Sequence, residues 1–116
     1  MPRLPVYIII DTSESMAGAP IKEVNQALAD FRVALNSYPA KMEIAYVSII
    51  TFNEKAVQLF ELTNVQLFQN PQLTADSSES SNYGEALSTL WECLNKEVVF
   101  RTTVTQRADY RPLVFF

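Results

Sequence analysis

The sequence predicts an α/β domain with a mainly parallel sheet, and three observations lead to that prediction. Residues 4–10 form an apolar, β-branched run without a polar face, which is typical of a central parallel strand covered by helices on both sides. A helical repeat follows this run. The predicted order of elements is β-α-β-β-α-β, so helices connect parallel strands and one strand lies antiparallel to its neighbour.

The first helix is predicted from Pro20 to the pair Tyr38-Pro39. Proline is a favourable first helical residue, and the residue before a proline disfavours the helical conformation. One apolar stripe at spacings of three and four residues supports the helix; its members are Ile21, Val24, Leu28, Phe31 and Leu35.

The later elements follow from similar patterns. Residues 42–52 predict a second buried strand, and residues 56–62 a third that pairs with it as a hairpin. Residues 63–75 predict a loop with a short helical turn. The polar stretch 76–82 is expected to cap a helix over 83–97. Residues 101–111 are predicted to form a solvated loop, and residues 112–116 the last strand.

The side chains of the second long helix are expected to divide into an apolar and a polar face. The expected apolar face consists of Ala86, Leu87, Leu90, Trp91 and Leu94. Trp91 and Phe31 are assigned to the core, and Cys93 to an inert position beside it.

Composition limits the classes of function. The 116 residues fit one domain over residues 1–116, and the 48% of hydrophobic residues argues against disorder. A net charge of -4 does not favour binding to nucleic acid or to an anionic membrane. The chain has no histidine and one cysteine, Cys93, which excludes Ser-His-Asp catalysis, histidine-ligated zinc and an internal disulfide.

No segment indicates targeting or membrane insertion. The apolar run at 6–10 is short for a signal peptide and is followed by Asp11. No stretch approaches the roughly 20 apolar residues that span a bilayer. We therefore expect a cytoplasmic protein.

The most informative segment is the polar loop directly after the first strand. In open α/β sheets, ligands bind at the carboxyl ends of the strands. An extended loop would aim Asp11, Ser13 and Ser15 at one point. One carboxylate and two hydroxyls are hard donors of low total charge, which suit Mg²⁺ or Mn²⁺. A polar loop before a helix is also often only a turn with capping residues, so both interpretations stay open.

We expect no enzymatic activity. An Asp after the first strand also begins the haloacid-dehalogenase-like phosphatases, but these need a second acid at the position of Ser13. The two glycines, Gly18 and Gly84, provide neither a P-loop nor a dinucleotide fingerprint.

The loop and its surroundings resemble the metal-ion-dependent adhesion site of von Willebrand factor type A domains. The resemblance covers almost the whole chain and is closest to a bacterial subgroup associated with tellurium resistance. It implies a three-layer, Rossmann-like sheet. The segments that carry it are residues 4–16 with the Asp-x-Ser-x-Ser pattern, Gly18, Pro20, and residues 24–26, 48–53, 73–75 and 111–116.

The resemblance also implies a set of metal ligands. Ser13 and Ser15 would bind the ion directly, and Asp11 would act through water or a hydrogen bond. Ser81 stands where the family has a Thr three residues before a helix-opening Gly, and the missing methyl group predicts a weaker site. Asp76 and Glu79 are expected to be solvated charges.

These ligands imply a non-enzymatic, metal-dependent protein-binding module. Mg²⁺ or Mn²⁺ would present a coordination position to an acidic side chain of a protein partner. The subgroup links this module to tellurite or general stress resistance.

Two departures from the family bear on this function. Glu14 stands where the family usually has Gly, and its carboxylate would add a ligand or take the partner's position. The family's second metal-site Asp follows the fourth strand, where this chain ends at Phe116. The resemblance therefore predicts an incomplete domain of about four strands and two main helices, with a weak or absent metal.

The last strand would then be an exposed apolar edge. The alternative function is a metal-free scaffold or remnant that self-associates through this edge.

Overall fold

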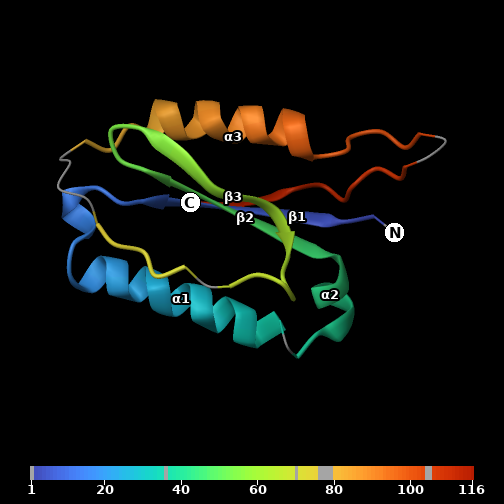
Figure 1. The fold of residues 1–116 in the computed structure, drawn as a ribbon, viewed down its shortest axis with the longest axis horizontal. Coiled ribbons are helices and arrows are strands. Elements are labelled where there is room, and N and C mark those ends of the chain that lie inside the picture. Colours follow the sequence, from blue (N-terminus) through green and yellow to red (C-terminus); the bar gives the residue numbers. More distant parts are fainter. Residues whose placement is uncertain (1, 36, 70, 76–79, 104–105) are drawn as a thin grey trace.

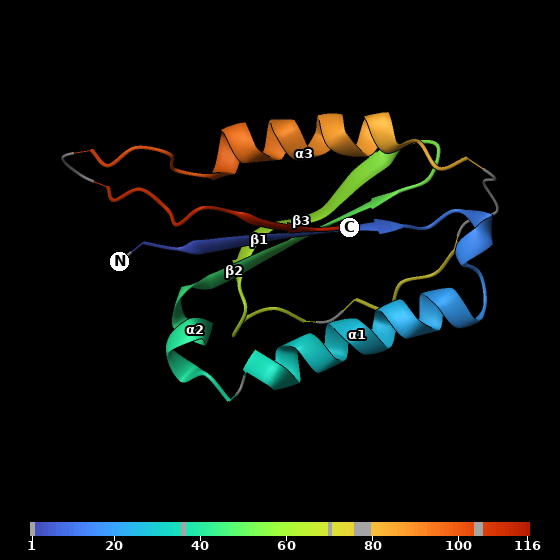
Figure 2. The ribbon, with the colours of Figure 1, turned by 180° about the vertical axis from the view of Figure 1, so that it is seen from behind.

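The computed structural model describes residues 2–35, 37–69, 71–75, 80–103 and 106–116. It has three layers, with helix α1 (Ala19–Leu35) on one face of a four-stranded sheet and helix α3 (Tyr83–Glu97) on the other (Figures 1 and 2). None of the helices in the described part of the chain is long and apolar enough to cross a membrane. The predicted α/β class and the two main helices are confirmed.

The strand order in the sheet is β3-β2-β1-β4. The central strand β1 (Leu4–Asp11) is parallel to both β2 (Ala45–Phe52) and β4 (Leu113–Phe115). β3 (Ala56–Asn64) is antiparallel to β2, which confirms the predicted hairpin and the single antiparallel strand.

The register of β1 and β2 positions the site. The two strands are aligned along their whole length, so that Asp11 at the end of β1 lies opposite Phe52 at the end of β2. The polar segments that follow these strands therefore begin at the same edge of the sheet.

Alternate residues of β1 enter two separate cores. Val6 and Ile10 pack with residues of α1, whereas Tyr7 and Ile9 pack with residues of α3. All four are at most 6% exposed, which explains why this strand has no polar face. The predicted stripe of α1 is also confirmed: Ile21 and Leu28 are buried, and its other members pack partly buried against the same core.

The predicted start of the second strand is wrong. Residues 42–44 belong to a short helix, α2 (Pro39–Ile44), and β2 begins at Ala45. Pro39 follows α1, as expected, but it also occupies the first position of α2, where its fixed φ is compatible with a helix and its missing N–H is not needed.

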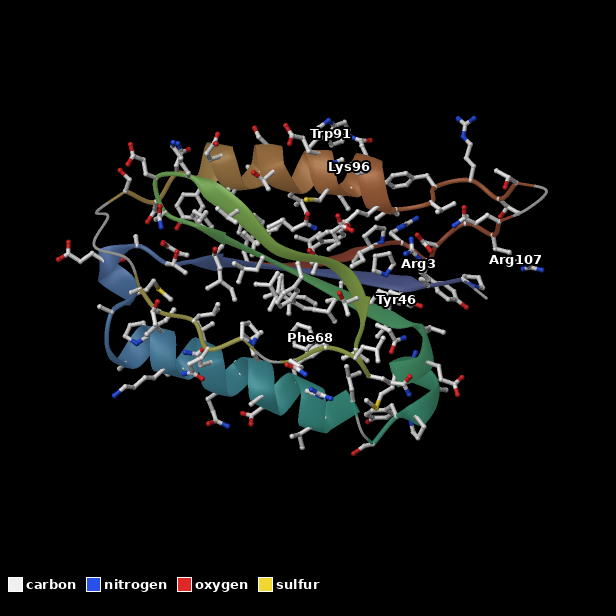
Figure 3. The ribbon with its side chains drawn as sticks, in the orientation of Figure 1. Arg3, Tyr46, Phe68, Trp91, Lys96 and Arg107 are labelled. Atoms are coloured by element: carbon white, nitrogen blue, oxygen red, sulfur yellow. The ribbon has the colours of Figure 1, made fainter. Side chains whose placement is uncertain are left out.

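The predicted apolar face of α3 is wrong in part. Leu87 is 52% exposed and Trp91 is 68% exposed, and Trp91 points away from the sheet (Figure 3). The buried residues are Ala86, Leu90 and Cys93. The next position of the same helical face is Glu97, whose carboxylate accepts hydrogen bonds from the sheet. A pattern of apolar residues alone misses a stripe that continues into a partly buried acid.

Glu97 holds the carboxyl end of α3 on the sheet. Its Oε1 accepts hydrogen bonds from the hydroxyl of Tyr7 and the amide of Gln58, both at 2.8 Å. Its Oε2 accepts one from the backbone N–H of Leu62 at 3.0 Å. Burial is the largest cause of a raised pKa at Tyr7, followed by the bond to Glu97, so this phenol stays protonated and donates.

The prediction that residues 101–111 form a solvated loop is wrong at Asp109. Its side chain is 2% exposed and accepts hydrogen bonds from Nε and Nη2 of Arg3 at 2.9 and 2.7 Å. The backbone N–H of Val99 adds a third at 2.8 Å. Arg3 also lies against the ring of Tyr46 (Figure 3). This ion pair joins the start of β1 to the segment that precedes β4.

Asp109 makes stability depend on pH in the acid range. Burial raises the pKa of this carboxyl, but the bonds and charge of Arg3 and the Val99 amide outweigh it, so the pKa lies below its usual range. The stabilisation is complete above the unfolded value of about 3.9. It is lost as the pH falls through the lower pKa of the folded state.

We expect Asp109→Asn to lower the free energy of unfolding at neutral pH by about 2 kcal/mol, since it removes charged hydrogen bonds. The difference from the parent should shrink below about pH 4. Urea denaturation between neutral and acid pH measures both effects. Glu54→Gln, at an exposed carboxylate in the turn between β2 and β3, is the control. A difference that stays constant with pH would contradict this account.

Candidate metal centre

The structure brings the four predicted ligand residues together at the carboxyl edge of the sheet. Ser81 Oγ lies 2.8 Å from Asp11 Oδ2 and 3.0 Å from Ser13 Oγ. Ser13 Oγ lies 3.1 Å from Ser15 Oγ. We call these four residues the oxygen cluster. Asp11, Ser13 and Ser15 come from the end of β1 and the turn after it, whereas Ser81 arrives from the segment before α3.

A tight turn, not the predicted extended loop, brings the first three residues together. Asp11 Oδ1 accepts a hydrogen bond from the backbone N–H of Ser13 at 2.8 Å. Residues Glu14–Met16 then form one 3₁₀ turn, η1, in which the Met16 N–H bonds to the Ser13 carbonyl at 3.0 Å. This turn returns Ser15 toward Ser13.

Glu14 fits into this turn without backbone strain. No described residue other than glycine has a positive φ, and the positive φ of +81° at Gly18 turns the chain from η1 into α1. The side chain of Glu14 is exposed, and none of the described hydrogen bonds joins its carboxylate to the oxygen cluster. The family's Gly is therefore not required by the backbone at this position.

The end of β2 holds both halves of the cluster in place. The backbone N–H of Thr12 donates to the Phe52 carbonyl at 2.8 Å, and that of Asn82 donates to the Asn53 carbonyl at 2.7 Å. Since Asn82 follows Ser81 directly, β2 fixes the position at which Ser81 meets Asp11.

The start of α3 is fixed in the same region. Asn82 Oδ1 accepts the N–H of Glu85 at 3.1 Å and so caps the helix. The ring of Tyr83 packs against that of Phe52, with 5.1 Å between their centroids.

The prediction that the stretch 76–82 caps the helix is confirmed at Asn82, but sequence analysis missed that Thr12, Asn53 and Asn82 support the cluster through β2. The signal for the last was present, because Asn followed three residues later by Glu is typical of a helix start. Asp76 and Glu79, expected to be solvated charges, lie outside the described residues.

Asp11 supplies the negative charge of the cluster. Burial raises the pKa of this carboxyl, but hydrogen bonds from the backbone and side chain of Ser13 and from the hydroxyl of Ser81 outweigh it. The pKa therefore lies below its usual range, and the carboxylate is ionised at neutral pH. Hydroxyl groups can rotate about the C–O bond, and the hydrogen bonds that the described residues give to these hydroxyls lie within the cluster.

The donor set fits a small divalent cation. The oxygen–oxygen distances of the cluster, 2.8, 3.0 and 3.1 Å, are those of hydrogen bonds. The two distances between hydroxyls, 3.0 and 3.1 Å, are also compatible with the spacing of about 2.9 Å between neighbouring ligands of an octahedral Mg²⁺. No group of three His, Cys, Asp or Glu side chains able to hold a metal occurs in the described part of the chain. The candidate site therefore has one carboxylate and three hydroxyls, which predicts weak binding.

Comparison with known proteins identifies the domain. The family model for the von Willebrand factor type A domain matches residues 6–114, a range that includes the whole oxygen cluster. Comparison with curated proteins found no significant match.

Proposed function

The chain belongs to the von Willebrand factor type A domain family, and on that premise we propose that it binds a protein partner through a divalent cation at the oxygen cluster. Domains of this family are in general protein-interaction modules. The observation that carries the proposal is the convergence of Asp11, Ser13, Ser15 and Ser81, whose oxygens lie within hydrogen-bond distance of one another. These residues come from segments 70 positions apart.

Each residue of the cluster has a proposed role. Ser13, Ser15 and Ser81 would bind Mg²⁺ or Mn²⁺ through their hydroxyl oxygens. Asp11 would provide the compensating charge and hold the hydroxyls of Ser13 and Ser81 through its hydrogen bonds. The bound ion supplies the positive charge that attracts an acidic side chain of the partner. The proposal contains no catalytic step.

The biological setting is a further part of the proposal. Segments throughout the chain resemble the bacterial subgroup associated with tellurium resistance, which suggests a role in tellurite or general stress resistance. This part rests on fold-level analogy. The cytoplasmic location and the absence of enzymatic activity stay predictions.

We expect Mg²⁺ or Mn²⁺ to raise the melting temperature of the parent chain, because a ligand that binds only the folded state stabilises it. An ion concentration about tenfold above Kd should give a rise of about 5 °C. In Asp11→Asn this rise should be lost, because the side chain keeps its shape but not its charge. Differential scanning calorimetry measures the shift.

Two controls make this result specific. Glu54→Gln removes a remote exposed carboxylate and should leave the shift intact. Glu14→Gln should also leave it intact if the exposed carboxylate of Glu14 is not a ligand. An equal rise in the parent and in Asp11→Asn would place the ion elsewhere and contradict the proposed site.

The exposed edge of the sheet supports the alternative, a metal-free scaffold that self-associates. β4 is an edge strand, and its residues Leu113, Val114 and Phe115 are 45%, 39% and 52% exposed. Leu113 and Phe115 line apolar grooves between β4 and α1. An apolar edge strand without a charged residue is suited to pair with a strand of a second copy.

If this alternative holds, the parent should form dimers or larger species that increase with concentration. Val114→Lys should shift the population to monomer, because a charged side chain on an edge strand opposes pairing. Val57→Lys is the matched control, because Val57 is 56% exposed on β3, the opposite edge. Sedimentation velocity measures the distribution. A monomeric parent would rule out this alternative.

A further inference from the structure

A cavity of about 450 Å³ lies at the same edge of the sheet as the oxygen cluster. Thr12, which lies between Asp11 and Ser13 in the chain, lines it, as do Thr51 and Asn53 at the end of β2. Residues 71–75 form the opposite wall. A partner segment held at the cluster would therefore have this cavity beside it.

The outer wall of the cavity is fixed although it has no regular secondary structure. Asn25 of α1 donates from its side-chain amide to the Leu73 carbonyl at 2.9 Å and accepts the Leu73 N–H at 2.8 Å. The side chain of Leu73 is 8% exposed and packs in the core beneath α1. Arg32 adds a hydrogen bond to the Phe68 carbonyl. This segment runs between the sheet and α1 (Figure 1), so the cavity is formed before a ligand arrives.

The lining of the cavity selects for uncharged polar groups. None of its described residues is ionisable. Hydroxyls and carboxamides come from Thr12, Thr51, Asn53, Gln72 and Thr74, and the remainder of the lining is apolar. The side chains of Thr12 and Asn53 bond to the protein itself, so Thr51, Gln72 and Thr74 are the groups offered to a ligand. A charged side chain would find no counter-ion among these described residues. A fully apolar side chain would cover the polar groups of Thr51, Gln72 and Thr74 without replacing their hydrogen bonds to water.

We propose that this cavity receives an uncharged polar side chain of the partner, such as Gln or Asn, adjacent in sequence to the acidic residue that binds at the oxygen cluster. The volume lies within the range of small-ligand sites and accommodates a side chain together with its flanking backbone. The inference rests on the proposed function and extends it, because the cavity would determine which acidic segments the domain accepts.

The test uses three capped pentapeptides and the ¹⁵N-labelled full chain in saturating Mg²⁺. Their sequences are Gly-Gln-Glu-Gln-Gly, Gly-Ala-Glu-Ala-Gly and Gly-Lys-Glu-Lys-Gly. We expect the first to bind about tenfold more tightly than the others, a ratio that corresponds to about 1.4 kcal/mol. It should also shift the amide resonances of Thr51, Gln72 and Thr74. Equal affinities, or shifts confined to the oxygen cluster, would overturn the inference.

Gln72→Trp tests the cavity directly, because it places a large ring at the exposed wall without altering the core. The preference for the Gln peptide should fall below about twofold, whereas Mg²⁺-dependent binding of the Ala peptide should persist. Gln69→Trp, an exposed position of the same segment outside the cavity lining, should keep the preference. An unchanged preference in Gln72→Trp would contradict the inference and leave the proposed function standing. If no peptide shows Mg²⁺-dependent binding, the proposed function fails, and the inference fails with it.

Discussion

The burial of β1 on both faces is the constraint on which the rest of the structure depends. The strand packs against α1 on one side and α3 on the other, and it pairs in parallel with β2 and β4. Parallel pairing brings the carboxyl ends of β1 and β2 to one edge of the sheet. The polar residues that follow Ile10 lie at that edge, where Thr12 and Ser13 are still buried, so both the oxygen cluster and the neighbouring cavity are placed by this strand.

The two ends of the sheet use carboxylates for different purposes. At one end, Glu97 and Asp109 bind backbone amides and side chains that are fixed by neighbouring elements, which indicates a structural role. At the other end, Asp11 accepts a hydrogen bond from the hydroxyl of Ser81, and the hydroxyls of Ser81, Ser13 and Ser15 also bond to one another. These hydroxyls can turn their lone pairs toward an ion without unfolding any element, which is what a binding site requires.

Much of the fold could be predicted from local patterns, because β1, α1 and the β2–β3 hairpin have the periodicity of their elements. The patterns failed where tertiary contacts decide. In α3, the stripe that faces the sheet continues to Glu97, and Trp91 lies outside it, exposed to solvent. Asp109 is held by Arg3, which lies 106 positions away in the sequence. At the site, the residues could be named from the sequence but their geometry could not. The turn at Glu14–Met16 and the support of Ser81 by Asn53 and Asn82 depend on contacts between distant segments.

The central claim is that the oxygen cluster binds a divalent cation, and paramagnetic relaxation by Mn²⁺ tests it most directly. A small fraction of Mn²⁺ added to the ¹⁵N-labelled chain should broaden the amide resonances of Ser13, Ser15 and Ser81, and excess Mg²⁺ should reverse the broadening. Resonances of Glu97 and Asp109, at the other end of the sheet, should stay sharp. Broadening that follows exposed acidic residues instead, or that persists in Asp11→Asn, would contradict the claim.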